Sequence, residues 1–321
     1  MSFSTYRYLL MTTDPVHIGT GGMRLGRVDN SIVREPGTRL PKIPGTSLSG
    51  AIRSYAAYRY GKRECAGQGV EKDGRKGHCG LPTCPICYTF GSVKGDSAFS
   101  GVVSIGDARL LLFPVYSMVG PVWVTSPSVL LDFGIEDQSV EDNKARWNGV
   151  TDRDQDHLNL GWLMVEKDKT EGDWTVPEGL PDPARSRTVL ISDKLFSQVV
   201  NSNLEVRTSV AINPETGAAE DGALFTYEAI PRATFLWMDV VVDDFLDKFP
   251  PTTKKYDKNM GDNGDNQGLD LGLSWNNPGD IINSALEWAE HLGIGGMGTR
   301  GFGRLKYKQL HPAETPCQEE K

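Results

Sequence analysis

Four cysteines lie close together in the first third of the sequence, and their spacing is typical of a metal site. Cys84 and Cys87 form a Cys-x2-Cys pair. Cys79 precedes this pair by five residues, and Cys65 lies fourteen residues before Cys79. Four such donors suit a closed, tetrahedral zinc ion. We therefore predict a structural zinc held by these four cysteines, with His78 in place of Cys65 as the alternative. Disulfides are the weaker interpretation in a cytosolic protein.

A second chemical possibility is an acid–base pair formed by His17 and Asp29, which are twelve residues apart. Such groups, alone or with a bound metal ion, could cleave RNA by driving a 2′-hydroxyl onto the adjacent phosphate. One histidine and one aspartate at this spacing are more often structural, so the pair alone does not decide the function. The sequence holds no Ser-His-Asp, Gly-x-Ser-x-Gly or His-Glu-x-x-His signature.

The third candidate is a glycine-rich stretch, GIGGMGTRGFG, at residues 293–303. Its spacing fits neither the Rossmann nor the P-loop pattern, and no Gly-Lys-Ser/Thr follows, so nucleotide hydrolysis has no support. Glycines between a helix and a basic strand could let backbone N–H groups approach phosphates. A simple flexible loop is the alternative.

Charge is unevenly distributed along the chain. The net charge of −8 argues against a generic nucleic-acid coat. However, residues 24–63 carry nine basic and two acidic groups, whereas residues 132–173 carry twelve acidic and five basic groups. A local basic stretch on an acidic protein can hold a phosphate backbone, although two ordinary solvated surfaces would give the same pattern. No stretch is apolar enough to span a bilayer and no signal peptide is evident, so we expect a cytoplasmic protein without a membrane partner.

The elements that must position these residues follow from hydrophobic periodicity, and they indicate an α+β fold. We predict strands at 3–12, 101–113, 119–131 and 234–242, a long hairpin from 204–212 and 223–230, helices from about residue 46 and over 280–292, and a final basic strand. Residues 134–185 are acidic and irregular, which predicts a surface insertion, and residues 250–279 predict a mobile loop.

The first helix begins after a Pro-Gly break, with Thr46 or Ser47 as its N-cap. The N-terminus of a helix presents unpaired N–H groups, which suit an anion. Arg53 lies one position off the buried face of this helix and could reach the same anion.

Four stretches together resemble one family. They are HIGTGGMRLGRVDNSIVRE, LPKIPGTSLSGAIR, SIGDARLLLFPVYSMVGPVWVTSP and GIGGMGTRGFGRLK. They resemble the RAMP superfamily and, within it, the repeated backbone subunit of type III-B CRISPR–Cas effectors. The stretch LEVRTSVAINPETGAAEDGALFTYEAIP also resembles the thumb hairpin of that family.

The resemblance implies a single domain over residues 1–321: a ferredoxin-like (RRM-type) palm with a projecting β-hairpin thumb. It also implies copies that stack into a filament along CRISPR RNA, with partners that include single-stranded target RNA and other type III subunits. The family cleaves target RNA at regularly spaced sites and depends on a divalent cation, Mg²⁺ or Mn²⁺. The parts would be a zinc-binding insertion at 62–95, the acidic insertion at 134–185, the thumb at 204–230 and the mobile loop at 250–279.

The same resemblance assigns roles to particular residues. Asp29 matches the family's essential aspartate, His17 its His-x-Gly histidine, and Glu228 an acidic residue beside the thumb. RNA contacts are expected from Lys42, Ser47, Ser49, Arg53, Gly296, Gly298, Thr299, Arg300 and Gly301. Two departures are Ser49, where the family often has lysine, and Ala229, where it often has tyrosine.

Three alternatives stay open at this point. The first is a non-catalytic backbone subunit of the same kind of complex. The second is a CRISPR RNA processing enzyme, which would need histidine chemistry, and His17 is the only histidine in a recognisable motif. The third is a stand-alone zinc hydrolase, which a fully four-ligated metal would exclude.

Overall fold

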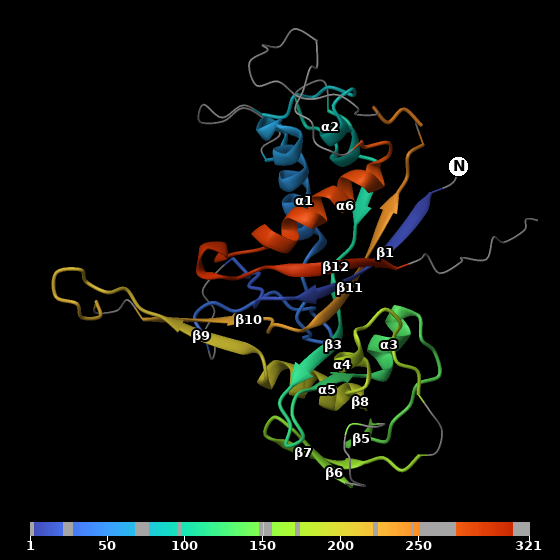
Figure 1. The fold of residues 1–321 in the computed structure, drawn as a ribbon, viewed down its shortest axis with the longest axis vertical. Helices are drawn as coiled ribbons and strands as arrows, with labels where there is room; N and C mark the ends of the chain where they lie inside the picture. The colour runs from blue at the N-terminus through green and yellow to red at the C-terminus, as the bar shows by residue number, and fades with distance from the viewer. Residues whose placement is uncertain are drawn as a thin grey trace, which may run out of the picture.

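Twelve strands and six helices make up the described part of the chain (Figure 1). The computed structural model describes residues 3–21, 28–67, 77–94, 98–147, 150, 156–170, 174–220, 224–245, 247–250 and 274–310. The strands are β1 (Ser4–Thr12), β2 (Val103–Ile105), β3 (Arg109–Val115), β4 (Val122–Thr125), β5 (Lys144–Trp147), β6 (His157–Leu160), β7 (Leu163–Lys167), β8 (Thr188–Ile191), β9 (Glu205–Ser209), β10 (Phe225–Ala229), β11 (Phe235–Val242) and β12 (Leu305–Leu310). The helices are α1 (Gly45–Tyr60), α2 (Pro85–Phe90), α3 (Pro127–Phe133), α4 (Asp182–Arg185), α5 (Asp193–Ser202) and α6 (Pro278–Leu292).

Ten of these strands form one sheet in the order β12-β1-β11-β3-β4-β8-β5-β7-β6, with β2 paired to β11. Strands β9 and β10 form a separate two-stranded sheet, and their hairpin projects from the body of the molecule (Figure 1). This mixed arrangement around a large sheet confirms the predicted α+β class.

Helices α1, α2 and α6 lie in the upper half of the molecule in Figure 1. Strands β12, β1, β11 and β3 are all antiparallel neighbours. Helices α1 and α6 pack on each other. Arg59 of α1 donates a 2.8 Å hydrogen bond to the carbonyl of Ser284 in α6. Tyr8 on β1 reaches α6 through a 3.0 Å hydrogen bond from its hydroxyl to Asn283 Oδ1. The two helices therefore cover the face of the sheet to which Tyr8 points.

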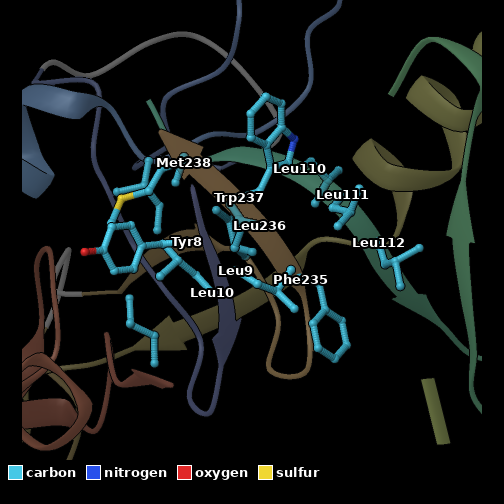
Figure 2. Close-up of a cluster of buried hydrophobic side chains, with 14 of the residues drawn as sticks. Tyr8, Leu9, Leu10, Leu110, Leu111, Leu112, Phe235, Leu236, Trp237 and Met238 are labelled. Atoms are coloured by element: carbon cyan, nitrogen blue, oxygen red, sulfur yellow. The ribbon is translucent and has the colours of Figure 1, made fainter. Parts of the chain in front are cut away.

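The core lies at the centre of this sheet, where β1, β3 and β11 meet (Figure 2). The run FLWMDVVV makes β11 apolar on both faces, and six of its eight residues are buried. Trp237 is 1% exposed, and the guanidinium carbons of Arg7 and Arg109 each lie 4.3 Å from the centre of its ring. Arg7 also donates a 2.6 Å hydrogen bond to the carbonyl of Phe133, which attaches α3 to the sheet.

The lower half of the molecule corrects two sequence-based expectations. Residues 134–185 were expected to be irregular, but they contain β5, β6, β7 and α4, and they bury side chains such as Trp147 and Leu160. Residues 119–131 were expected to be a single strand, but they form β4 and the start of α3. Pro127 is the reason, because proline is well suited to the first turn of a helix and poorly suited to a central strand.

Helix α6 matches its prediction and begins two residues earlier than expected. Asn277 and Asp280 form a capping box, and Pro278 occupies the first turn. Gly293 ends the helix at the predicted position. Most of the predicted 250–279 loop, residues 251–273, lies outside the described residues. Among the described residues, no helix combines the length and apolar character that a membrane span requires.

Candidate catalytic site and metal centre

Asp29 is exposed, and its carboxylate is held by the β10 strand. The backbone N–H and the hydroxyl of Thr226 both donate to Asp29 Oδ2, at 2.7 and 2.9 Å. The Thr226 hydroxyl also accepts a 3.1 Å hydrogen bond from the backbone N–H of Asp29. Because these donors stabilise the charged form, the backbone N–H of Thr226 first of all, they lower the pKa of Asp29. The carboxylate is therefore ionised near neutral pH.

The backbone around Asp29 runs beside β10 for several residues. Asn30 forms a parallel bridge with Tyr227, in which the Asn30 N–H donates to the carbonyl of Thr226 and the Glu228 N–H donates to the carbonyl of Asn30, both at 3.0 Å. The segment after Asp29 thus forms an added edge on the base of the β9–β10 hairpin. This contact joins residues that are 197 positions apart in sequence.

Glu228 lies on the same strand and forms an internal ion pair. Its side chain is 10% exposed, and its Oε2 accepts a 2.8 Å hydrogen bond from Arg34 Nη2. Ile32 N–H donates to the same oxygen at 3.4 Å. Arg34 also donates a 2.9 Å hydrogen bond to Asn201 Oδ1 at the end of α5. Glu228 therefore ties the 30–34 segment, β10 and α5 together.

His17 is buried and connects β10 with the glycine-rich loop. Its Nδ1 lies 2.6 Å from the carbonyl oxygen of Glu228, so Nδ1 must carry a proton. In the neutral imidazole the other nitrogen, Nε2, is then unprotonated. A Cβ atom on Gly19 would lie only 3.2 Å from Nε2. The backbone carbonyl of His17 accepts a 2.9 Å hydrogen bond from the Gly296 N–H.

The glycine-rich loop contains two glycines at its ends that approach each other and a set of exposed residues between them. A Cβ on Gly303 would lie 2.5 Å from the carbonyl oxygen of Ile294, and one on Gly293 would lie 2.8 Å from Gly303. These two glycines allow the ends of the loop to touch. The predicted RNA-binding residues of the loop are all exposed: Gly296, Gly298, Thr299, Arg300 and Gly301. A Cβ on Gly301 would meet none of the described atoms within 4 Å, so that glycine is open to a ligand.

Aromatic and basic side chains join this loop to the hairpin. The guanidinium of Arg300 lies 5.4 Å from the Phe225 ring centre, and that of Arg207 lies 4.7 Å from the Phe302 ring centre. The rings of Tyr227 and Phe302 pack edge to face with centres 5.6 Å apart. The hairpin base and the loop therefore share a small aromatic cluster, in which Tyr227 and Phe302 are buried and Phe225 is half-buried, and the guanidinium groups of Arg300 and Arg207 lie against it.

The N-terminus of α1 is already occupied by a carboxylate of the same chain. Asp107 Oδ1 accepts a 2.7 Å hydrogen bond from the Gly45 N–H, and its Oδ2 pairs with Lys42 Nζ at 2.5 Å. The N-cap is Pro44, so the predicted cap at one of the two following hydroxyl residues was wrong. An anion was expected at this helix N-terminus, and the anion found there is Asp107 of the same chain, which accepts a hydrogen bond from the Gly45 N–H.

The other predicted RNA contacts of α1 differ in their surroundings. Ser47 and Ser49 are half-buried. Arg53 points to the cysteine-rich segment, where its Nε donates to the carbonyl of Cys65 at 2.7 Å and its Nη1 to that of Phe90 at 3.3 Å. Burial lowers the pKa of Arg53, and the nearby cysteines oppose that shift. The structure therefore does not bring Arg53 together with Asp29.

The four predicted cysteines meet in one cluster. All four sulfurs lie within 4.8 Å of one another. Three of the separations are 3.9 Å for Cys65–Cys84, 3.6 Å for Cys79–Cys87 and 3.7 Å for Cys65–Cys87. Four sulfurs bound at about 2.3 Å to one tetrahedral zinc would lie roughly 3.8 Å apart. The donor set therefore fits a zinc ion.

His78 lies outside this cluster. The Nε2 of His78 lies 2.9 Å from the carbonyl oxygen of Gly67. The group of possible metal ligands consists of the four cysteines alone. The geometry therefore favours four cysteine ligands over the variant with His78.

A family model decides the family. The model of the RAMP superfamily matches residues 9–306, which include every site described above. The chain belongs to the RAMP superfamily.

Individual relatives agree with this RAMP assignment. The CRISPR system Cmr endoribonuclease Cmr4 of Pyrococcus furiosus is 28% identical over 254 residues, which span 73% of this chain and 80% of that protein. A cryo-EM structure of the type III-B Cmr-beta complex bound to cognate target RNA contains a chain with the same fold, at a TM-score of 0.63, 15% identity and coverage of 95% and 97%. A crystal structure of Cmr4 gives a TM-score of 0.55 at 21% identity, with coverage of 96% and 99%.

Sequence reasoning missed three residues that shape this RAMP site. Thr226 holds Asp29, Arg34 pairs with Glu228, and Asp107 occupies the α1 N-terminus. The only available signal was for Arg34, which belongs to the basic stretch at 24–63. Thr226 and Asp107 lie in stretches that resemble the family, but nothing in those stretches indicates their contacts with Asp29 and with the α1 N-terminus.

The ion pair of Glu228 leads to a stability prediction. Removing one partner of a buried ion pair leaves the other charge uncompensated. We therefore expect Glu228→Ala to lower the free energy of unfolding by roughly 3 kcal/mol, measured by urea denaturation. Glu205→Ala is the control, since its pair with Arg207 is more exposed and should contribute less than about 1 kcal/mol. Equal losses in the two variants would contradict a structural role for the Glu228 pair.

Proposed function

We propose that this chain is a backbone subunit of a type III CRISPR–Cas complex, which binds CRISPR RNA along a filament and cleaves complementary target RNA at regularly spaced sites. The observation that carries the proposal is the ionised Asp29 carboxylate, exposed at the hairpin base, where the exposed Arg207 and the exposed Arg300 of the glycine-rich loop lie against one aromatic cluster. The relative named as a Cmr endoribonuclease supports the RNA-cleaving activity.

The strand order and the hairpin suggest which elements would form the palm, the thumb and the insertions of such a subunit. Strands β1, β3, β11 and β12 with helices α1 and α6 would be the ferredoxin-like palm, since the order β12-β1-β11-β3 places the fourth strand beside the first. The β9–β10 hairpin, within residues 204–230, would be the thumb that displaces one base of the guide–target duplex. One insertion, residues 62–95, would carry the zinc segment. A second insertion, residues 134–185, would carry strands β5, β6 and β7.

The electrostatics of Asp29 favour one chemical role over another. An efficient general base has a pKa near the working pH, whereas the hydrogen bonds from Thr226 lower the pKa of Asp29 below its ordinary value. Asp29 would therefore act by its negative charge, and it is the residue that would hold a Mg²⁺ or Mn²⁺ ion. Such a cation would stabilise the charge that develops on the phosphate. Holding the target backbone near in-line geometry would supply much of the remaining acceleration.

His17 and Glu228 would support this site from inside. Both are buried, and both connect β10 to a neighbouring segment: His17 to the glycine-rich loop and Glu228 to Arg34. These contacts favour a role in holding the site together over direct contact with RNA. The exposed loop residues from Gly296 to Gly301, with Arg300 and Arg207, would bind RNA phosphates and leave sequence recognition to base pairing.

The proposal predicts a cation-dependent pattern of cleavage. The assembled complex, given end-labelled RNA complementary to its guide, should yield regularly spaced products with Mg²⁺. EDTA should abolish them, and added Mg²⁺ should restore them within minutes, which separates the cleavage cation from a structural zinc. Target RNA that binds tightly but stays intact with Mg²⁺ or Mn²⁺ would favour a non-catalytic backbone subunit instead.

A further inference from the structure

We propose that Thr226 is a positioning residue for RNA cleavage, which fixes the Asp29 carboxylate and couples it to the hairpin. This inference rests on the proposed function of Asp29. Thr226 lies in the stretch that resembles the thumb hairpin, but the resemblance assigns it no role, and its role emerges only from the contact between β10 and the 29–32 segment.

The first argument is the set of hydrogen bonds. A threonine hydroxyl offers one donor and two acceptor positions. In Thr226 the donor goes to Asp29 Oδ2 and one acceptor position takes the Asp29 N–H, at 2.9 and 3.1 Å. The backbone N–H of Thr226 adds a second donor to Oδ2 at 2.7 Å. Hydrogen bonds to an ionised carboxylate are among the stronger ones in proteins, so one residue fixes both the backbone and the side chain of Asp29.

The second argument is the direction that these bonds impose. Both donors of Thr226 converge on Oδ2. Oδ1 would then be the oxygen that contacts a cation or the RNA. Without Thr226, an exposed aspartate would populate several rotamers, because few neighbours restrict it. Loss of the Thr226 hydroxyl would therefore reduce the fraction of molecules in which Asp29 is correctly oriented. RNA affinity would not change.

The third argument is the anchoring of Thr226 itself. It is half-buried on β10, and two residues further along the same strand Glu228 is tied to Arg34. The β-branched side chain of threonine restricts rotation about its first side-chain torsion, which keeps the hydroxyl directed at Asp29. Because β10 is one arm of the hairpin, a movement of the hairpin on the target RNA would move Asp29 with it.

The test compares Thr226→Val with Thr226→Ser in the assembled complex. Valine keeps the shape and strand preference of threonine and has a methyl group in place of the hydroxyl. We expect Thr226→Val to lower the single-turnover cleavage rate roughly tenfold at saturating target, with target affinity unchanged. Thr226→Ser should retain activity within about threefold, because its hydroxyl can make the same hydrogen bonds. Thr5→Val, at a half-buried strand position of β1, is the matched control and should cleave at the wild-type rate.

The outcomes separate this inference from the function on which it rests. Wild-type cleavage by Thr226→Val, in a complex that Asp29→Asn inactivates, would overturn only the positioning role. Parallel losses of affinity and rate in Thr226→Val and Thr226→Ser would also overturn it, since they would indicate a structural effect. Wild-type cleavage by Asp29→Asn would overturn the proposed function and this inference together.

Discussion

Replacing Asp29 by asparagine is expected to reduce target RNA cleavage by at least roughly a hundredfold, the scale of losing one acid–base or charged catalytic group. Asparagine preserves the size and shape of the side chain. Its amide oxygen can still accept the two hydrogen bonds that Thr226 donates to Oδ2. The substitution therefore removes the negative charge and leaves the local geometry in place. The measurement is the single-turnover rate with labelled target at saturating complex.

Target affinity should move in the opposite direction or not at all. An ionised carboxylate beside phosphates repels them, so its presence is a disadvantage if binding is the only purpose. Asp29→Asn should bind target RNA as tightly as the wild-type chain or slightly better. Asp132→Asn is the matched control, because Asp132 is exposed and has only a 3.5 Å pair with Arg109. If Asp29→Asn cleaves at the control rate, the chain is a structural binder and the nuclease assignment is wrong.

Several elements of the upper half could be predicted because their apolar runs are long. Strands β1 and β11 span nine and eight residues, and helix α6 spans fifteen with a clear N-cap and a following glycine. The lower half was missed because its strands have only four or five residues, as in β5, β6 and β8. Runs of that length do not show whether an apolar segment is a strand, a helix end or a loop.

Individual residues of the candidate site were predicted, but the contacts between them were not. Family resemblance pointed to Asp29, His17 and Glu228, and the structure places all three at β10. The roles of their partners could not be predicted, because a pairing across about two hundred residues leaves no local pattern. The same limit explains the error at α1. The helix N-terminus was recognised as an anion site, but the anion is Asp107, sixty-two residues further along.

Replacing Cys84 by serine is expected to remove the metal and to destabilise the chain strongly. Cys84 is buried, it caps α2, and its sulfur lies 3.9 Å from that of Cys65. Zinc content should fall from about one ion per chain to near zero, because three thiolates bind much more weakly than four. Metal binding is coupled to folding in such sites. A loss of several kcal/mol should lower the melting temperature by about 10 °C in a domain of this size.

The effect of Cys84→Ser on RNA cleavage should be smaller than its effect on stability and zinc content. A four-cysteine site has no open position for water or substrate, so a metal bound there would support the fold and would take no part in the reaction. Cys84→Ser should therefore lose stability and zinc before it loses activity, and at a temperature where it remains folded it should cleave far better than Asp29→Asn. Cys317→Ser, a cysteine outside the described residues, should keep both zinc and melting temperature. A chain without zinc, in which Cys84→Ser melts like the wild type, would show that this cluster of thiols is not a metal centre.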